Sequence, residues 1–302
     1  MLISTKKLFK KCYGSYAISA VNVFNMEQVL GLFAAADYCG APFIVQTTPV
    51  ARNYANAVML LNMIEAASKI YPNTVYAIHL DHGVENHIFD AIGSKHYTSV
   101  MIDASHDDFD TNVARTKKVV EYAHKLGVLV EAELGVLSGV EDDISIEEND
   151  AKYTNPDYVV KFVALTNCDS LAIAVGTSHG AYKFSGEQGL KFDILKKIQK
   201  SLPEFPLVLH GGSAVNSDEI KSINIHGGKL FEGAKGVDDA QLKEAIKYGI
   251  CKVNIATDTR LIWARVHREF FAKHPGKFDP IIPGNIYIEE QKKFLIKKFE
   301  LL

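Results

Sequence analysis

The sequence lacks the features that mark several large classes of protein. Its four cysteines are scattered, with no Cys-x-x-Cys pair and no spacing typical of a disulfide framework. Free thiols are therefore expected, as in a protein of the reducing cytoplasm. No stretch approaches the ~20 apolar residues of a membrane-spanning helix. The basic N-terminal segment also lacks the uncharged run of a signal peptide.

A large excess of charge is missing as well. The chain carries 33 Lys and Arg against 36 Asp and Glu, a formal net charge of −3. Such a balance gives no general attraction to nucleic acid or to acidic membranes, so we expect neither as a partner. With 302 residues the chain can bury a large core. No shift in composition marks a second domain, and we expect one domain over residues 1–302.

Short apolar runs alternate with helical patterns along the chain. There are eight such runs, and each is followed by a stretch with helical apolar spacing; they lie at 17–23, 42–46, 75–80, 99–102, 128–134, 171–175, 207–209 and 251–255. This alternation indicates parallel strands joined by crossover helices. Eight units in about 250 residues or more predict an α/β fold, a single (β/α)8 TIM barrel. A doubly wound sheet is the alternative, but no Gly-x-Gly-x-x-Gly fingerprint follows the first run.

Several segments around these units have patterns of their own. Residues 6–13 predict a short N-terminal helix, and residues 288–299 a C-terminal helical extension. Residues 54–71 read as one continuous helix ended by Pro72. Residues 138–150 are acidic and poorly patterned, which indicates a loop.

Polar residues gather at or just after the ends of the predicted strands. In a (β/α)8 barrel the active site lies at those C-terminal ends. A scatter unrelated to function would put as many polar groups at the strand starts. The residues concerned are Asn22, Thr48, Asp81, His82, Asp103, Glu133, His179, His210 and Asn254.

Three of these residues are histidines at equivalent positions. His82, His179 and His210 follow the third, sixth and seventh predicted strands. A catalytic zinc site commonly has three protein ligands and one open position. A lone histidine would more often be a hydrogen-bonded or solvated group, but three at matching strand ends favour a metal site. Nitrogen ligands suit zinc, although cobalt or iron would also fit them.

The carboxylates offer acid–base groups. Asp81 precedes His82, so its side chain is expected to face another way at the same depth, where it can exchange a proton with a substrate. Its alternative role is the N-cap of the following helix. Glu141, in the acidic loop, is a candidate general base, although most acids in such loops are only solvated. Asp103 and Glu133 offer either a second metal position or structural hydrogen bonds.

Glycine and hydroxyl residues follow the last two predicted strands, at 210–213 (HGGS) and 254–257 (NIAT). Loops in these two places form the usual phosphate site of this barrel. Glycine lets backbone N–H groups approach an anion, and Gly180 is positioned to add another amide. The alternative is that these are tight-turn glycines. Because both loops lie in the expected places, we favour a phosphate-binding site.

Six stretches carry a resemblance to a known family. They are HLDHG at 79–83, SVMIDASH at 99–106, VEAELG at 130–135, GTSHGAYK at 176–183, HGGS at 210–213 and CKVNIATD at 251–258. Their order and spacing resemble those of the class II, metal-dependent ketose-1,6-bisphosphate aldolases over nearly the whole chain. The family's reaction is the reversible cleavage of fructose 1,6-bisphosphate to dihydroxyacetone phosphate and glyceraldehyde 3-phosphate, a step of glycolysis and gluconeogenesis.

The resemblance implies a role for each matching residue. It makes His82, His179 and His210 the ligands of one catalytic Zn²⁺, lets Asp81 handle the proton of the C4 hydroxyl, and lets Glu141 move the proton on the ketone-side carbon. It also implies a nearby monovalent cation, Na⁺ or K⁺, and a homodimer or homotetramer. The implied substrate contacts are Gly180, Lys183, Gly211, Gly212, Ser213, Asn254, Ala256 and Thr257 at the dihydroxyacetone phosphate end, and Asn22 and Thr48 at the other phosphate.

The chain departs from the family pattern at the acceptor end. Many fructose bisphosphate members carry an acid at the position of Ala256, whereas tagatose bisphosphate members tend to have alanine. Arg260 resembles the distal-phosphate arginine of one fructose bisphosphate subgroup, but the basic residue that this subgroup has after 278–280 is missing. Tagatose bisphosphate, or a ketose 1-phosphate with another anionic tail such as a sulfonate, is therefore an alternative. A metal-dependent hydrolase and a non-catalytic aldolase-like subunit are rival interpretations from other classes.

Overall fold

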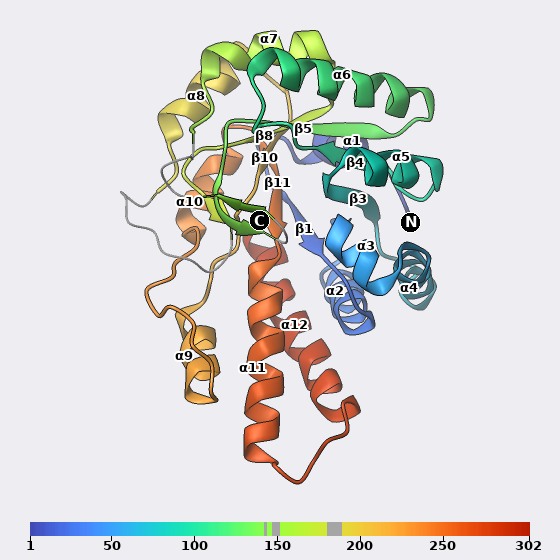
Figure 1. Cartoon of the computed structure of the whole chain (residues 1–302), viewed down its shortest axis with the longest axis vertical. Coiled ribbons are helices and arrows are strands. Elements are labelled where there is room, and N and C mark those ends of the chain that lie inside the picture. Colours follow the sequence, from blue (N-terminus) through green and yellow to red (C-terminus); the bar gives the residue numbers. More distant parts are fainter. Residues whose placement is uncertain (142–143, 147–151, 180–188) are drawn as a thin grey trace.

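A closed barrel of eight parallel strands forms the centre of the protein (Figure 1). This computed structural model describes residues 1–141, 144–146, 152–179 and 189–302, and within them the side chains of all but 138–141, 144–146 and 179. The barrel order is β1-β11-β10-β8-β5-β4-β3-β2, which confirms the predicted (β/α)8 fold. The strands are β1 (Ile18–Asn22), β2 (Phe43–Thr47), β3 (Tyr76–Gly83), β4 (Ser99–Ile102), β5 (Leu129–Leu134), β8 (Ser170–Ile173), β10 (Leu207–Leu209) and β11 (Ile250–Ile255).

Helices surround the barrel, and several begin at side-chain caps. Asn25, Asp108 and Asn155 each accept a hydrogen bond from a backbone N–H of the first turn, which satisfies a donor that has no partner within the helix. The helices are α1 (Thr5–Cys12), α2 (Met26–Cys39), α3 (Pro49–Ala55), α4 (Ala57–Ile70), α5 (Glu85–Gly93), α6 (Phe109–Lys125), α7 (Pro156–Thr166), α8 (Phe192–Ser201), α9 (Ser217–Ile225), α10 (Asp239–Ile246), α11 (Thr257–Lys273) and α12 (Ile281–Leu301).

The two faces of the barrel strands have opposite chemistry. Ile78 and Leu80 of β3 belong to the large apolar core beneath the helices. The residues between and beyond them point into the barrel, because successive strand residues alternate in direction. Three strands each have two polar side chains that are buried and point inward: His79 and Asp81 of β3, Glu131 and Glu133 of β5, and Lys252 and Asn254 of β11. The barrel interior therefore holds a cluster of charged groups rather than an apolar core alone.

The short N-terminal helix seals the other end of the barrel. Leu8, Phe9 and Cys12 of α1 pack against Ile18, Ala20, Ile44, Ala77 and Cys251 in a separate apolar cluster. This plug keeps water from the N-terminal ends of the strands. It leaves the C-terminal ends as the place where polar side chains meet.

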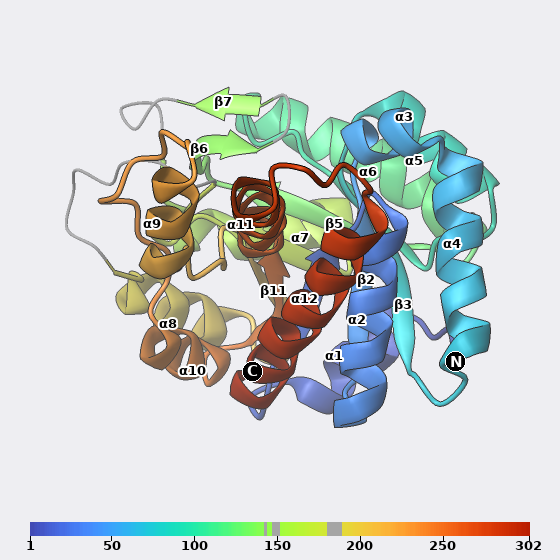
Figure 2. The same ribbon diagram turned by 90° about the horizontal axis from the view of Figure 1, so that it is seen from below.

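The C-terminal extension is longer than predicted. Helix α12 begins at Ile281 rather than at 288, and Pro283 fits in its first turn because the N–H groups there have no partner within the helix. It runs alongside α2 (Figure 2), where the Gln291 amide donates to the Gln28 carbonyl oxygen at 3.1 Å. With α11 it extends away from the barrel (Figure 1). None of the helices in the described ranges combines the length and the apolar character needed to cross a membrane.

Two local predictions were wrong. Residues 54–71 are not one helix: residues 54–55 end α3 and residues 57–70 are α4, because Asn56 between them has a φ of 65° and caps α4 through its side chain. Residues 138–150 are not simply a loop: β6 (Ser138–Glu141) pairs with β7 (Ile144–Ile146) and with β9 (Ser178–His179). The β-branched residues of this segment favour strands, a signal that its acids obscured. Residues 142–143 and 147–150 lie outside the described residues.

Gly83 is a point where the barrel has no room for a side chain. A Cβ there would lie 2.5 Å from Cγ1 of Ile88 and 2.8 Å from the Met101 carbonyl oxygen, whereas one at Gly93 of α5 would meet nothing within 4 Å. We predict that Gly83→Ala lowers the free energy of unfolding by about 1–3 kcal/mol through overpacking. Gly93→Ala should leave it unchanged or raise it by about 0.5–1 kcal/mol. Urea denaturation of both variants measures this, and equal stabilities would contradict it.

Candidate active site

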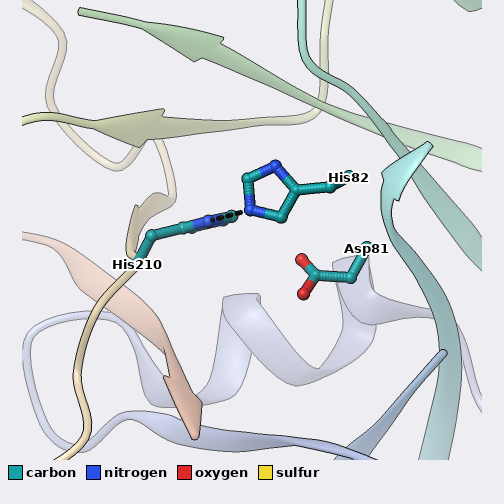
Figure 3. Close-up of side chains that lie close together, drawn as sticks. All are labelled: Asp81, His82 and His210. Atoms are coloured by element: carbon teal, nitrogen blue, oxygen red, sulfur yellow. Dashed lines mark hydrogen bonds between the residues drawn. The ribbon is translucent and has the colours of Figure 1, made fainter. Parts of the chain in front are cut away.

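A β-bulge at the end of β3 brings two neighbouring side chains to one place. Leu80 pairs with Val100, but Gly83 pairs with Ile102, so β3 carries one extra residue here. His82 sits in this bulge with a φ of 44°, an uncommon value for a residue other than glycine. As a result Asp81 and His82 offer ligand atoms within 4.8 Å of each other and of His210 (Figure 3). The prediction that Asp81 faces another way from His82 was therefore wrong.

Each of the two imidazoles is oriented by a carboxylate. His82 places Nδ1 3.3 Å from Oδ2 of Asp103, and His210 places Nε2 3.0 Å from Oε1 of Glu131. An ionised carboxylate only accepts hydrogen bonds, so the nitrogen that faces it carries the proton. The other nitrogen of each ring, Nε2 of His82 and Nδ1 of His210, then presents a lone pair. This carboxylate–imidazole arrangement is typical of metal ligands.

Those two lone-pair nitrogens face each other. They lie 3.0 Å apart, with the rings at 87° (Figure 3). The contact is a hydrogen bond if one of the two rings carries a second proton, and a pair of ligand atoms if both rings are neutral. With metal–nitrogen distances of 2.0–2.1 Å, two tetrahedral ligands of zinc place their nitrogens about 3.3 Å apart. The pair therefore fits a metal ion after a small opening.

The pKa values favour this arrangement. Burial lowers the pKa of His210 even though the hydrogen bond to Glu131 raises it, so the neutral, metal-binding form is favoured. Burial alone would raise the pKa of Asp103. The hydrogen bond from His82 and those from Ser105 outweigh burial and hold the pKa of Asp103 well below its usual range. Asp103 is thus ionised and accepts from His82.

The described side chains of the barrel mouth carry an excess of negative charge. Four carboxylates, those of Asp81, Asp103, Glu131 and Glu133, accompany the single ammonium group of Lys252, which gives about −3 when all are ionised and the imidazoles are neutral. A divalent cation would offset most of it. Ligand atoms of His82, Asp103 and Glu133 also lie within 4.8 Å of one another, as a second metal position would require.

Three side-chain amides surround the carboxylate of Asp81. Asn22 donates to Oδ2 at 3.1 Å, Gln46 to Oδ2 at 3.3 Å, and Asn254 to Oδ1 at 3.2 Å. The N-cap of α5 is Val84, without a side-chain cap bond, so Asp81 does not cap that helix. Gln46 was not predicted as a site residue; its one signal in the sequence was a polar residue inside an apolar run. The structure thus directs Asn22 at Asp81.

A second cluster of polar side chains lies deeper in the barrel. Lys252 places Nζ 2.7 Å from Oε2 of Glu131, and His79 places Nδ1 2.8 Å from Oγ of Ser99. Burial and the Lys252 charge hold the pKa of His79 well below its usual range, so its imidazole is neutral. Burial tends to raise the pKa of Glu131, but the charge of Lys252 and the hydrogen bond from His210 bring it well below the usual range. Glu131 and Lys252 were not predicted as site residues; their signal in the sequence was a charged residue inside an apolar strand.

The predicted phosphate loops lie next to each other. The Ser213 hydroxyl accepts from the backbone N–H of Ala256 at 3.4 Å, which links the two loops. Asp258, buried in the first turn of α11, accepts from the N–H groups of Ala214 and Val215 at 2.9 and 2.8 Å. Helix α11 has no side-chain cap at Ala256, so the N–H groups of its first turn face this region without one.

The remaining predicted residues are placed less completely. Thr48 accepts from the N–H of Ala51 and so caps α3. Arg260 is half-buried in α11. A Cβ on Gly211 would overlap the backbone of Ser178, so the segment before His179 packs directly on the loop after His210. The side chains of His179 and Glu141, together with Gly180 and Lys183, lie outside the described residues.

Comparisons with known proteins point the same way. Residues 3–302 match the family model described as fructose-bisphosphate aldolase class-II. The chain is 42% identical over 288 residues to the fructose-bisphosphate aldolase of Giardia intestinalis, covering 94% of this chain and 88% of that protein. It is 42% identical over 299 residues to the one of Treponema pallidum, covering 92% and 89%.

Solved structures share the fold. The structure of the YdjI aldolase from Escherichia coli K12 superposes with a TM-score of 0.77 at 26% identity and covers 100% of this chain and 97% of that one. The fructose-bisphosphate aldolase of Campylobacter jejuni superposes with a TM-score of 0.75 at 23% identity and covers 100% and 95%. The latter likeness shows the fold alone.

The neutral buried imidazole of His79 makes a pH dependence testable. Its pKa is lower in the folded state than the ordinary value of about 6.5 in the unfolded state, so the unfolded state binds more protons below that pH. We predict that the metal-free protein loses stability as the pH falls from 7 to 5, by up to about 1.4 kcal/mol per pH unit for this histidine. His79→Gln should reduce this slope in urea denaturation. The same change at the exposed His96 should not, and equal slopes would contradict the prediction.

Proposed function

The chain belongs to the class II fructose-bisphosphate aldolase family, a family of lyases, and we propose that it cleaves fructose 1,6-bisphosphate reversibly to dihydroxyacetone phosphate and glyceraldehyde 3-phosphate. The observation that carries this proposal is the cluster at the barrel mouth. There the buried carboxylate of Asp81 lies within 4.8 Å of ligand atoms of His82 and His210. A proton acceptor beside a metal site is what cleavage next to a ketone requires.

The family implies a divalent metal ion, for which we propose zinc held by His82, His179 and His210. When bound, the ion supplies a Lewis acid that stabilises the negative charge developing on the ketone oxygen. Asp103 and Glu131 orient the two described imidazoles for this role. We propose Asp103 and Glu133, with His82, as an alternate position for the ion.

Asp81 is the proposed base of the cleavage direction. It takes the proton of the C4 hydroxyl, the C3–C4 bond breaks, and the electron pair passes to the ketone half as an enediolate while the aldehyde leaves. The amides of Asn22, Gln46 and Asn254 hold its carboxylate in one orientation and, as donors, do not compete for that proton. Glu141 is the proposed group that returns a proton to C3.

The loops after β10 and β11 are the proposed site for the phosphate of the dihydroxyacetone half. Their support is the contact between Ser213 and the N–H of Ala256, together with the start of α11, a 17-residue helix without a side-chain cap. We assign Gly180, Lys183, Gly211, Gly212, Asn254 and Thr257 to the same end, and Asn22, Thr48 and Arg260 to the other phosphate. Because the amides of Asn22 and Asn254 already contact Asp81, each would have to serve both Asp81 and its phosphate.

We also propose a monovalent cation, Na⁺ or K⁺, near the phosphate loops, and a homodimer or homotetramer. Phe278, 90% exposed between α11 and α12, and Ile281, 65% exposed at the start of α12, support self-association. The four cysteines are free thiols, which suits the reducing cytoplasm we propose as its location.

Tagatose 1,6-bisphosphate is the second candidate substrate. Ala256 is 9% exposed at the start of α11 and brings a methyl group where many fructose bisphosphate members have an acid. An anionic tail such as a sulfonate is also compatible with a site altered in this way. The ordered contacts of Asp81 argue against a non-catalytic subunit, and the paired phosphate loops against a metal-dependent hydrolase.

The proposed function predicts metal-dependent cleavage. Purified protein should release dihydroxyacetone phosphate from fructose 1,6-bisphosphate, lose this activity on chelation and regain it with added Zn²⁺, because the ketone oxygen then regains its Lewis acid. Parallel kinetics with tagatose 1,6-bisphosphate and a sulfonated ketose 1-phosphate determine the substrate. Cleavage that survives complete metal removal, with an imine that borohydride traps, would sink the proposed mechanism.

Asp81→Asn should separate proton transfer from metal binding. Asparagine keeps the shape but takes no proton, so we predict a fall in kcat of about 10²–10⁴-fold. The Kd for Zn²⁺ should stay unchanged, because Asp81 is a base and not a ligand in this proposal. Asp107→Asn, which alters an exposed ion pair with Arg115, is the matched control and should keep normal kcat. Near-normal turnover of Asp81→Asn, or weaker zinc binding, would reassign Asp81.

A further inference from the structure

The buried pair of Lys252 and Glu131 has no assigned part in the reaction. We propose that Lys252, acting through Glu131, is a positioning residue that holds His210 as the Nε2–H tautomer and so directs its Nδ1 lone pair at the metal. This inference rests on the metal site of the proposed function. It adds two residues, neither of which touches the substrate.

The contacts form one chain across the barrel. Lys252 Nζ lies 2.7 Å from Glu131 Oε2, Glu131 Oε1 lies 3.0 Å from His210 Nε2, and His210 Nδ1 lies 3.0 Å from His82 Nε2. Lys252 is on β11 and Glu131 on β5, and β10 and β8 separate these strands in the barrel. The pair therefore spans the interior, and His210 follows one of the strands in between.

Lys252 decides the direction of the hydrogen bond to His210. A neutral Glu131 with its proton on Oε1 would donate to Nε2 and leave the histidine proton on Nδ1, where it would block a metal. The ammonium group at 2.7 Å instead favours the ionised carboxylate, which accepts on both oxygens. Nε2 must then carry the proton of a neutral His210.

His79 does not compete for this carboxylate. Its Nε2 lies 3.6 Å from Glu131 Oε2, beyond hydrogen-bond distance, and its Nδ1 contacts Ser99 Oγ at 2.8 Å. The two oxygens of Glu131 are therefore divided between Lys252 and His210. With all of these side chains buried, water does not replace either partner.

Lys252 is also badly placed to attack a ketone. It precedes Asn254 by two residues on the same strand face, and Asn254 is the residue that contacts Asp81 at the mouth. A strand rises about 3.3 Å per residue, so Lys252 starts roughly 6–7 Å deeper than that contact. Its 1% exposure and its bond to Glu131 fit a positioning residue and not a Schiff-base lysine.

The test reads the tautomer of His210 directly. In the 302-residue protein labelled with ¹⁵N-histidine, NMR correlations assign the proton of His210 to Nε2 or Nδ1. The spectra are recorded on the protein stripped of metal and on the protein loaded with Zn²⁺. We predict Nε2–H in both states. A proton on Nδ1 in the wild-type protein would overturn the inference, and this reading needs no variant to fold.

Variants test the route through Glu131. Lys252→Met should move the proton of His210 toward Nδ1 in the stripped protein and raise the Kd for Zn²⁺ by about 10–100-fold, a typical effect of losing a partner that orients a ligand. Lys252→Arg should restore most of both. Glu131→Gln should raise the Kd similarly, and Glu131→Gln combined with Lys252→Met should be no worse, because Lys252 acts only through Glu131.

The matched control is Glu219→Gln. It makes the same chemical change in a Glu–Arg pair with Arg265, between α9 and α11, and should leave the zinc Kd and the tautomer unchanged. Wild-type zinc affinity in both Lys252→Met and Glu131→Gln would overturn the inference. Failure of the proposed function is distinguishable: the tautomer and Kd would respond as predicted while no ketose bisphosphate is cleaved.

Discussion

Hydrogen bonds between buried carboxylates and imidazoles hold the barrel mouth in one arrangement. Asp103 and Glu131 each face one nitrogen of a histidine, and the opposite nitrogens of His82 and His210 then meet 3.0 Å apart. Buried charges persist only when they are paired, and here each pairing also decides where a proton sits. The proposed metal site, the proposed base Asp81 beside it and the Lys252–Glu131 pair deeper in the barrel all depend on this arrangement.

The bulge at the end of β3 lets two chemically different groups share that mouth. A regular strand would send Asp81 and His82 to opposite faces. The extra residue and the positive φ of His82 bring them together, while three amides from β1, β2 and β11 hold Asp81 in place. Strain in the backbone at this point is thus tied to function: one residue supplies a proposed ligand and its neighbour a proposed base.

The two ends of the barrel differ in chemistry. Helix α1 plugs the N-terminal ends of the strands with apolar side chains, while the C-terminal ends carry the polar cluster and the two paired loops. Between them lies the layer of Lys252, Glu131 and His79, which is neither apolar core nor substrate site. In a buried polar layer each charge needs a partner of opposite sign. Here Glu131 of β5 and Lys252 of β11 are each other's partners across the barrel.

The sequence by itself determined the number of β/α units, the place of His82, His210 and Asp81 at the ends of barrel strands, and the family, because these follow from local periodicity and short motifs. It did not reveal the break at Asn56, which depends on the left-handed backbone conformation of that one residue. It also did not reveal the hairpin of β6 and β7, where a run of acidic residues obscures the pattern of a strand. Only the tertiary structure decided which nitrogen of His82 and His210 faces the other, that Gln46 supports Asp81, and that Lys252 meets Glu131. Those residues lie on strands far apart in the chain, and the direction of a hydrogen bond depends on atoms that only the closed barrel brings together.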